Sequence, residues 1–248
     1  MAPSTLDGLS ACRLSIIVPA YNEETRLPHS LPEIIRFVRE QNYPVEVLVV
    51  DDGSLDRTAD IVREFQRQAG FITLIQVPHG GKGHAVRSGM LRAGGEYLFL
   101  CDSDLSMPID EVTKFLPPAT QEYDVAIASR EAPGARRFNE PAYRHLMGRV
   151  FNLMVRVLAV HGVQDTQAGF KCFRREAARQ VFRRQTISGW GFDVEVLFIA
   201  QRHGMRVVEV PIHWHYKERS QIRPVQDTYN MLREVLKVRW NAWRGRYD

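Results

Sequence analysis

The stretch VEVLVVDD at residues 45–52 decides the fold of this 248-residue chain. It is a mostly apolar, β-branched run that ends in two aspartates, as is typical of a strand buried on both faces of a parallel sheet. Similar runs are LSIIVPAY (14–21), FITLIQV (71–77), EYLFLCDSD (96–104) and DVAIAS (124–129). The first half of the chain therefore predicts five buried strands.

Between these runs the apolar residues recur at helical spacing. The pattern predicts helices from about Ser30 to Gln41, after Asp56, after the glycine-rich turn at residues 80–83, and from about Ile109. Strands and helices that alternate with short connections call for a mostly parallel sheet with helices on both faces. The fold class is α/β.

The second half is patterned differently. Proline and charge fill residues 131–141, which predicts a mobile loop. Further helices are expected over residues 143–160, 192–203 and 224–243, and short strands over 170–173 and 207–214. We divide the chain into a flexible N-terminus (1–12), one domain (13–220) and a C-terminal amphipathic helix that associates with membranes (221–248).

The composition is that of a globular protein, with 44% hydrophobic and 25% charged residues. No stretch approaches the roughly 20 apolar residues that cross a bilayer, and the N-terminus lacks a signal-peptide pattern. The three cysteines are scattered, which indicates thiols in a reducing compartment, so we expect a cytoplasmic protein.

The net charge of +4 is concentrated in an arginine-rich segment, 130–156, and near the C-terminus. A solvated basic face is one interpretation, and attraction to phosphate or to an anionic membrane is the other. Charge alone does not separate the two. We expect no nucleic-acid partner, and the sequence leaves the oligomeric state open.

Polar clusters follow all five predicted strands of the first half. They are Asn22-Glu23, Asp51-Asp52, Gly80–Gly83, Asp102–Asp104 and Arg130. Because ligands of open α/β sheets bind beyond the carboxyl ends of the strands, these clusters predict one binding site at that edge.

Asp102 and Asp104 are the candidate metal ligands. Carboxylates one residue apart at a strand end suit Mg²⁺ or Mn²⁺ shared with a substrate diphosphate. A solvated turn is the alternative for an isolated Asp-x-Asp, but the acidic pair Asp51-Asp52 is expected to end a neighbouring strand and favours the metal site. Lys82, in the glycine-rich turn, is expected to reach a phosphate.

Two kinds of acceptor remain open. Asp193, near a helix start, is a candidate general base for an alcohol acceptor. A phosphate acceptor needs orientation by arginines instead, and Arg130 and Arg144 are the candidates for this clamp. His213 and His215 share one strand face, but without a third ligand nearby we interpret them as ordinary polar strand positions.

Four of these motifs resemble family 2 inverting glycosyltransferases with a GT-A fold, over about residues 13–220. Ile17-Val18-Pro19-Ala20-Tyr21-Asn22-Glu23 resembles the opening motif of that family, and Val49-Val50-Asp51-Asp52-Gly53-Ser54 its nucleotide-base segment. Gly81-Lys82-Gly83-His84-Ala85 resembles its Lys-Gly-x-Ala element, and Asp102-Ser103-Asp104 its metal motif.

The second half is similar to the dolichyl-phosphate sugar synthases of that family. Ala128-Ser129-Arg130 resembles their Gly-Ser-Arg, and Asp165-Thr166-Gln167-Ala168-Gly169-Phe170-Lys171 resembles a motif of the β-glucosyltransferases. Gln167 and Asp193 separate the chain from the mannose-transferring relatives. The resemblance implies UDP-glucose as the donor and a polyprenyl phosphate as the acceptor.

The resemblance also assigns roles to residues. Pro19, Tyr21, Glu23 and Asp52 would hold the base and ribose, Asp102 and Asp104 the metal and diphosphate, and Arg130 and Arg144 the acceptor phosphate. Lys217 or Arg219 would close over the donor phosphates. Arg219-Ser220-Gln221 stands where relatives have Gly-Ser-Lys.

We therefore expect a metal-dependent hexosyltransferase that transfers glucose with inversion to a polyprenyl or dolichyl phosphate, peripherally at the cytoplasmic face of a membrane. Trp240, Trp243 and Tyr247 would touch the lipid headgroups. Alternatives are a GDP-mannose-dependent mannosyltransferase, a family 2 enzyme with a soluble or saccharide acceptor and Asp193 as base, and a nucleotide-binding or scaffold protein without catalysis.

Overall fold

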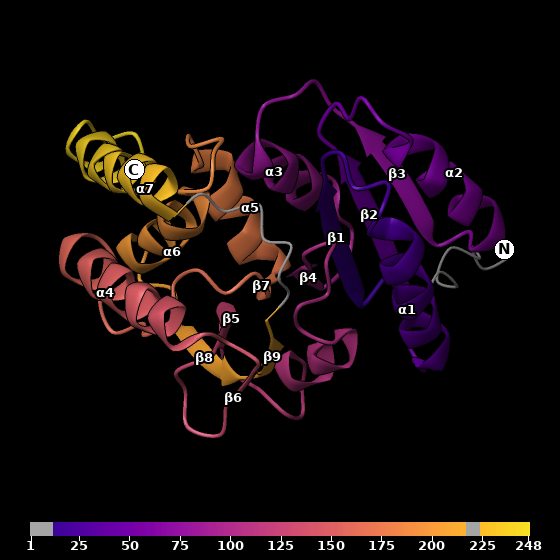
Figure 1. Ribbon diagram of the computed structural model, residues 1–248, viewed down its shortest axis with the longest axis horizontal. Coiled ribbons are helices and arrows are strands. Elements are labelled where there is room, and N and C mark those ends of the chain that lie inside the picture. Colours follow the sequence, from indigo (N-terminus) through magenta and orange to yellow (C-terminus); the bar gives the residue numbers. More distant parts are fainter. Residues whose placement is uncertain (1–11, 217–223) are drawn as a thin grey trace, which may run out of the picture.

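The computed structural model describes residues 12–216 and 224–248, with backbone only for residues 142–147, 150–151 and 224–231. Their centre is a seven-stranded sheet with the order β3-β2-β1-β4-β7-β5-β8 (Figure 1). The strands are β1 (Leu14–Ala20), β2 (Val45–Asp51), β3 (Ile72–Gln76), β4 (Tyr97–Leu100), β5 (Val125–Ser129), β7 (Lys171–Arg174) and β8 (Val207–Pro211). Only β7 is antiparallel to its neighbours, so the expected mostly parallel α/β sheet is confirmed.

Helices cover both faces of the sheet (Figure 1). They are α1 (Leu27–Glu40), α2 (Thr58–Gln68), α3 (Lys82–Arg92), η1 (Ile109–Phe115), α4 (Ala142–Leu158), α5 (Arg175–Arg184), α6 (Phe192–Arg202) and α7 (Pro224–Trp243). Side chains of α1, α2 and η1 join one core cluster, and those of α3, α5, α6 and α7 join the other.

The alternation of side chains along β2 shows why the sheet is covered twice. Val47 and Val49 belong to the first cluster, whereas Leu48 and Val50 belong to the second. Successive strand residues point to opposite faces, so a strand that is apolar throughout needs a packed layer on each side. The polar residues that follow such strands are left at the edge of the sheet.

The structure departs from the expectations in several places, most of them in the second half. The segment 131–141, expected to be a mobile loop, contains β6 (Arg136–Phe138), which pairs in parallel with β9 (His213–His215). The helix α5 was not predicted, and the helix expected from Ile109 is a 3₁₀ helix. The central strand β7 comes from a run of only four residues, too short to reveal its place between β4 and β5.

Some expectations lie outside the described residues. These are the flexible N-terminus, apart from Cys12, and the roles of Lys217 and Arg219. Among residues 12–216 and 224–248, no helix combines the length and apolar character needed to span a bilayer.

Candidate active site

The carboxyl ends of β1, β2 and β4 meet at one edge of the sheet, with β1 between the other two. Asp52 follows β2 and donates its backbone N–H to the carbonyl of Ala20 at the end of β1, at 2.9 Å. Cys101, just before Asp102, donates its N–H to Ile17 of β1. The acidic turns after β2 and β4 therefore lie at one edge of the sheet, as predicted, but on either side of β1 and not on neighbouring strands.

Asp52 fastens the glycine-rich turn to the end of β2. Its two carboxylate oxygens accept hydrogen bonds from the backbone N–H groups of Gly80 and Gly81, at 3.0 and 2.8 Å. Gly81 has φ of +100°, a conformation that favours glycine. Asp52 is 2% exposed, so this buried carboxylate positions the turn that leads into α3.

An aromatic pair lies next to the glycine-rich turn. The rings of Tyr21 and His79 are stacked with their centroids 4.2 Å apart, and His79 Nδ1 lies 2.8 Å from Asp52 Oδ2. Both rings are partly exposed, which suits a flat ligand such as a nucleotide base. Sequence reasoning named Tyr21 but missed His79, although its place directly before the glycine-rich turn was a signal.

Glu23 connects the ends of β1 and β4. Its carboxylate pairs with Arg26 at 3.0 Å and accepts a hydrogen bond from Ser103, in the turn after β4. Burial raises the pKa of Glu23, and the nearby carboxylate of Asp104 adds to this shift. Asp104, in the turn after β4, therefore lies close enough to the Glu23 carboxylate to act on it electrostatically.

Lys82 joins the glycine-rich turn to the acidic turn after β4. Its Nζ lies 2.7 Å from Asp102 Oδ1 and 4.9 Å from the ring centre of Trp190. Burial disfavours the charged ammonium, but the carboxylates of Asp102 and Asp193 raise the pKa of Lys82 above its ordinary value. The lysine is therefore a buried positive charge between the two acidic groups.

Gly169 closes the other side of Asp102. A Cβ atom at this glycine would lie 2.6 Å from Asp102 Cγ and closer still to Oδ2. The backbone of residue 169 thus packs closely against the Asp102 carboxylate. A side chain at position 169 would displace this carboxylate. Asp104, two residues on, accepts a hydrogen bond from the N–H of Ser106 at 2.8 Å.

The donor set of this pocket fits a hard divalent cation. The structure brings the carboxylates of Asp102 and Asp104 to the end of β4, beside the phosphate-sized turn at Gly80–Lys82. Carboxylate oxygens are the ligands that Mg²⁺ and Mn²⁺ prefer. Among the described residues, no group of three or more His, Cys, Asp or Glu is arranged so that it could hold a metal ion by itself.

Asp193, the candidate base, is held in a buried ion pair. Lys171 Nζ lies 2.5 Å from Asp193 Oδ1 and also donates to the carbonyl of Ala168 at 2.7 Å. The side chains are 0% and 7% exposed. This lysine comes from β7 and the aspartate from the first turn of α6, so the pair ties the two elements together.

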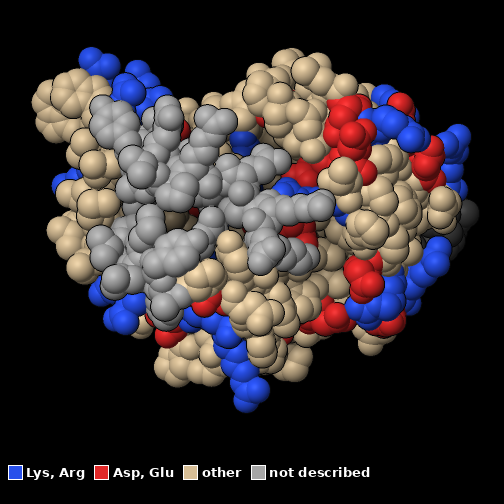
Figure 2. Space-filling model, viewed as in Figure 1, with Lys and Arg blue, Asp and Glu red and all other residues tan. Residues whose placement is uncertain are grey.

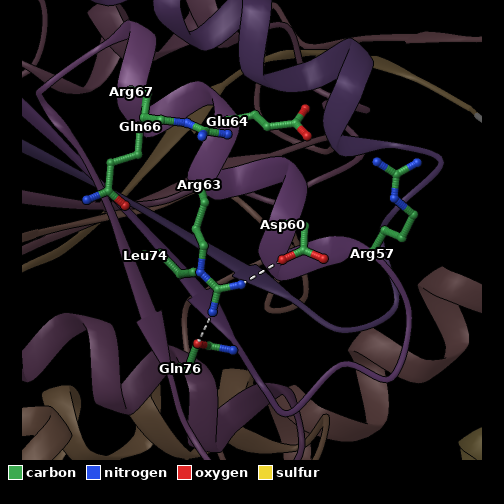
Figure 3. A pocket seen from close by; sticks show the side chains of 8 residues that line it. All are labelled: Arg57, Asp60, Arg63, Glu64, Gln66, Arg67, Leu74 and Gln76. Carbon is green, nitrogen blue, oxygen red and sulfur yellow. Dashed lines mark hydrogen bonds and ion pairs between the residues drawn. The ribbon is translucent and has the colours of Figure 1, made fainter.

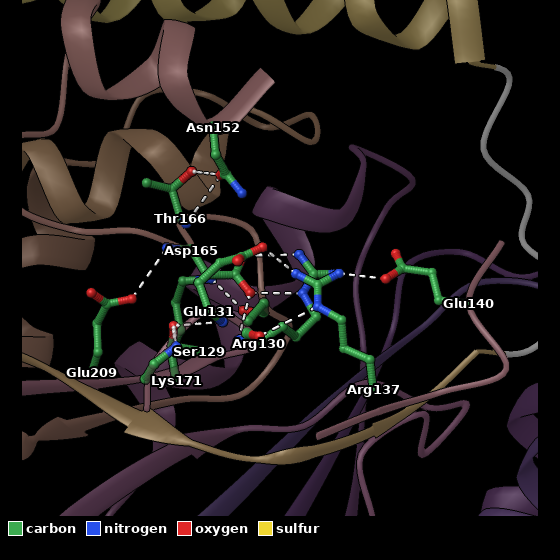
Figure 4. A network of polar contacts seen from close by, with 12 residues as sticks. Ser129, Arg130, Glu131, Arg137, Glu140, Asn152, Asp165, Thr166, Lys171 and Glu209 are labelled. Atoms are coloured by element: carbon green, nitrogen blue, oxygen red, sulfur yellow. Dashed lines mark hydrogen bonds and ion pairs between the residues drawn. The ribbon is translucent and has the colours of Figure 1, made fainter. Parts of the chain in front are cut away.

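Arg130, the candidate phosphate clamp, is held by Asp165. Its Nε and Nη2 donate to the two oxygens of Asp165 at 2.7 and 2.8 Å, and its backbone N–H donates at 3.0 Å (Figure 4). Arg130 also lies over the Trp214 ring, at 5.3 Å from its centre. This bidentate pairing fixes the plane of the guanidinium group.

The segment after Arg130 is ordered by Arg137, which sequence reasoning missed. Arg137 of β6 pairs with Glu131 and, at 2.5 Å, with Glu140, and its Nε donates to the Arg130 carbonyl at 3.3 Å (Figure 4). These contacts and the β6–β9 pairing hold residues 131–141, which corrects the expectation of a mobile loop.

The Arg130–Asp165 pair predicts an acid-sensitive contribution to stability. Burial opposes ionisation, but Arg130 lowers the pKa of Asp165 to about 2, from about 3.9 in an unfolded chain. A depressed carboxyl pKa stabilises the fold fully above about pH 5, and the contribution of about 2 kcal/mol is lost as the pH falls to 2. Urea denaturation should show the stability gap between wild type and Asp165→Asn narrowing by that amount. A gap that is constant from pH 5 to pH 2 would contradict the assignment.

The structure also locates the other residues that the sequence analysis singled out. Pro19 is the next-to-last residue of β1, two residues before Tyr21. Arg144 lies on α4, and its side chain is outside the described part of the structure. His213 pairs with Glu111, and His215 stacks on Phe138, as ordinary strand positions would. The prediction that Tyr247 touches the lipid headgroups is wrong. The side chain is fully buried, and its hydroxyl donates a hydrogen bond to the Glu195 carboxylate at 2.7 Å.

A groove along α2 and the edge strand β3 lies apart from these residues (Figure 3). Arg63 crosses it, donating to Asp60 of α2 at 2.8 Å and to Gln76 of β3 at 2.7 Å. None of its lining residues belongs to the predicted site. The catalytic candidates therefore concentrate at the carboxyl edge.

The sheet order and the acidic turns at its carboxyl edge define the GT-A class of fold. Solved structures agree: glucosyl-3-phosphoglycerate synthase from Mycobacterium tuberculosis in complex with UDP matches with a TM-score of 0.64 and 21% identity, over 92% of this chain and 80% of that chain. The same enzyme with Mn²⁺, UDP-glucose and phosphoglyceric acid matches with a TM-score of 0.65 and 17% identity, over 95% and 80%. At these low sequence identities, the similarity to the solved structures shows a shared fold and nothing further.

The family follows from the sequence comparisons. Residues 15–182 match the glycosyl transferase family 2 model, and the chain belongs to this family. Dolichyl-phosphate beta-glucosyltransferase ALG5D of Trichomonas vaginalis is 33% identical, over 93% of this chain and 75% of that protein. Dolichyl-phosphate beta-glucosyltransferase of Homo sapiens is also 33% identical, over 94% and 78%.

Proposed function

We propose that this glycosyltransferase moves glucose from UDP-glucose to dolichyl phosphate or a related polyprenyl phosphate, with inversion and with Mg²⁺ or Mn²⁺. The observation that carries the proposal is one segment, residues 165–171, that touches three of the candidate catalytic residues. Asp165 holds Arg130, Gly169 presses on Asp102, and Lys171 holds Asp193. The names of the relatives support glucose and the lipid phosphate.

The two ends of the site suit two anionic substrates. Tyr21, His79 and Asp52 offer stacking and polar groups to the base, and Lys82 offers a charge to the diphosphate. Arg130, whose Nε and Nη2 are held by Asp165, lies at the far end of the segment, and the acceptor phosphate would bind there through the Nη1 side of the guanidinium group. Binding both substrates at fixed positions converts the transfer into an effectively intramolecular step.

The state of Asp193 favours a phosphate acceptor over an alcohol. One of its oxygens already receives the Lys171 ammonium at 2.5 Å, so the carboxylate is occupied by a buried partner. An alcohol would need this carboxylate to take a proton, whereas a phosphate already carries the charge for attack. We assign Asp193 to holding Lys171 and α6 in place.

The reaction is then a single displacement. A phosphate oxygen of the lipid attacks the anomeric carbon of glucose from the side opposite the diphosphate. As the new carbon–oxygen bond forms, the bond to the diphosphate breaks, and UDP departs with the electron pair. A cation held by Asp102 and Asp104 would offset the charge that develops on the leaving diphosphate.

The helices α4 and α7 support a lipid acceptor. They contact each other and carry two exposed apolar stripes, Leu153 and Val157 on α4 and Leu236, Trp240 and Trp243 on α7. Exposed basic residues accompany them: Arg149, Arg156, Lys237, Arg239, Arg244 and Arg246. Figure 2 shows basic side chains beside uncharged surface at the upper left, where α7 lies in Figure 1. This pattern suits an anionic membrane surface.

A donor and acceptor screen tests the function. UDP-[¹⁴C]glucose, Mn²⁺ and dolichyl phosphate in detergent should give a labelled product that is extracted by organic solvent and is labile to acid. GDP-[¹⁴C]mannose should give much less. The proposal fails if label from UDP-glucose enters only water-soluble products, for example with 3-phosphoglycerate as the acceptor.

We expect the double variant Trp240→Ser/Trp243→Ser to lose membrane binding without losing its fold. The two rings are 52% and 77% exposed, so their removal costs little stability, but burying aromatic surface in headgroups drives adsorption. Cosedimentation with vesicles of phosphatidylcholine and phosphatidylserine should fall at least about fivefold. Leu55→Ser, at an exposed apolar residue in the turn before α2, is the matched control and should bind as wild type does. Equal binding by all three proteins would refute the proposal that Trp240 and Trp243 bind the membrane.

A further inference from the structure

Three carboxylates of the active site are paired with cations of the protein itself. Glu23 pairs with Arg26 at 3.0 Å, and Asp193 with Lys171 at 2.5 Å. Asp102 pairs with Lys82 at 2.7 Å. Figure 2 shows acidic and basic side chains intermingled near the middle of the face drawn there. The charges of these three carboxylates are thus offset before any substrate binds, and a divalent cation that binds Asp102 competes with a charge already there.

The three cations differ in how they are held. Lys171 is 0% exposed and also donates to the Ala168 carbonyl, so it is fixed in the core. Arg26 lies three residues from Glu23 on the same turn. Lys82 is 17% exposed at the start of α3, and its long side chain reaches Asp102 from the glycine-rich turn. Of these three, Lys82 stands between the proposed diphosphate and metal positions.

Both oxygens of the Asp102 carboxylate have a close neighbour within the protein, although the side chain is 28% exposed. Lys82 takes Oδ1, and the backbone of Gly169 presses against the side of Oδ2. The segment 165–171 is itself anchored by the Asp165 and Lys171 pairs, so Gly169 has little freedom to withdraw. A cation that binds Oδ1 of Asp102 therefore competes with the Lys82 ammonium.

We propose that Lys82 is a competing counter-ion: it occupies Asp102 in the resting enzyme and transfers to the donor diphosphate when metal and nucleotide enter together. The inference rests on the proposed function, because it needs a metal and a diphosphate in this pocket. It adds an order to the binding. The cation binds weakly alone because Lys82 then has no diphosphate to move to. The nucleotide binds weakly alone because Lys82 then stays paired with Asp102.

Thermodynamic linkage predicts how metal and nucleotide affect each other's affinity, and this effect can be measured. If the nucleotide strengthens metal binding by some factor, the metal strengthens nucleotide binding by the same factor. Coupling of this kind typically amounts to about 5- to 150-fold. Removal of the lysine charge should raise the metal affinity of the resting protein and, at the same time, reduce the coupling. A lysine that only binds phosphate would leave the metal affinity of the resting protein unchanged.

Manganese binding to the whole chain tests the proposal without any turnover. Free Mn²⁺ would be measured by electron paramagnetic resonance, with and without UDP, for wild type, Lys82→Met and Lys82→Arg. We expect UDP to tighten Mn²⁺ binding at least about tenfold in wild type. Lys82→Met should bind Mn²⁺ about tenfold more tightly without UDP, and UDP should then add less than about threefold. Lys82→Arg keeps the charge and should follow wild type.

The matched control is Lys114→Met. Lys114 also pairs with a carboxylate, Glu111 at 2.7 Å, but on η1, away from the glycine-rich turn. This variant should bind Mn²⁺ as wild type does. The proposal is overturned if Lys82→Met, folded by circular dichroism, binds Mn²⁺ no more tightly than wild type without UDP, or if its coupling to UDP is unchanged. Glucose transfer by wild type in the assay above would show that such a failure concerns Lys82 and not the proposed function.

Discussion

Asp104→Asn should lower kcat for glucose transfer at least about a hundredfold while leaving the fold intact. The asparagine keeps a side-chain carbonyl oxygen, which can accept the hydrogen bond that Asp104 Oδ1 receives from Ser106. The turn after β4 is therefore preserved. What is lost is one negative oxygen toward the cation, and with it charge stabilisation of the departing diphosphate. Initial rates at saturating UDP-glucose, with Mn²⁺ varied, would measure the effect.

Asp110→Asn is the control for this prediction. Asp110 lies on η1 just beyond the acidic turn, and it pairs with Arg36 at 2.8 Å in an exposed position. Exposed pairs contribute about 0–1 kcal/mol, so this variant should keep both its melting temperature and its rate. If Asp104→Asn turns over as fast as Asp110→Asn, Asp104 does not act on the reacting groups.

The second large effect is expected from Gly169→Ala. The added methyl group would lie 2.6 Å from Asp102 Cγ, so the carboxylate must rotate away from its present position. Such a movement also withdraws Oδ1 from Lys82. A displacement of about 1 Å in a catalytic group costs roughly a hundredfold in rate. We therefore expect kcat to fall by about that factor and Mn²⁺ binding in the presence of UDP to weaken in parallel.

A matched substitution separates this local effect from general damage. Gly70 has open space around its Cα, and Gly70→Ala should leave rate and stability unchanged. Gly169→Ala itself should cost about 1–3 kcal/mol of stability, as overpacking does, so its rate is to be measured well below its melting temperature. Full activity in a folded Gly169→Ala enzyme would mean that the contact between Gly169 and Asp102 does not set the metal position.

The first half of the molecule could be predicted from sequence because its signals are local. An apolar β-branched run followed by Asp51-Asp52 or Asp102–Asp104 marks a strand and the turn after it within about ten residues. Parallel connection through helices then places all such turns at the same edge. The common pocket of Asp52, Lys82 and Asp102 follows from this pattern, and the structure agrees.

The second half could not be predicted equally well. Tyr247 was placed at a membrane because of its aromatic neighbours, but the chain turns back after α7 and buries it against Phe198 and Glu195. Residues 131–141 were expected to be mobile because proline and charge are frequent there. Pairing of β6 with β9 and the contacts of Arg137 order them instead, and both depend on partners distant in the sequence.

By itself, the sequence determined the α/β class, the edge of the sheet where the site lies and the carboxylates that would meet a cation. Only the tertiary structure decided the partners of the catalytic candidates: Asp165 for Arg130, 35 residues away, and Lys171 for Asp193, 22 residues away. It also placed Gly169 against Asp102. The physical reason is that strand and turn propensities act over a few neighbouring residues, whereas these contacts form only when the antiparallel strand β7 is inserted between β4 and β5.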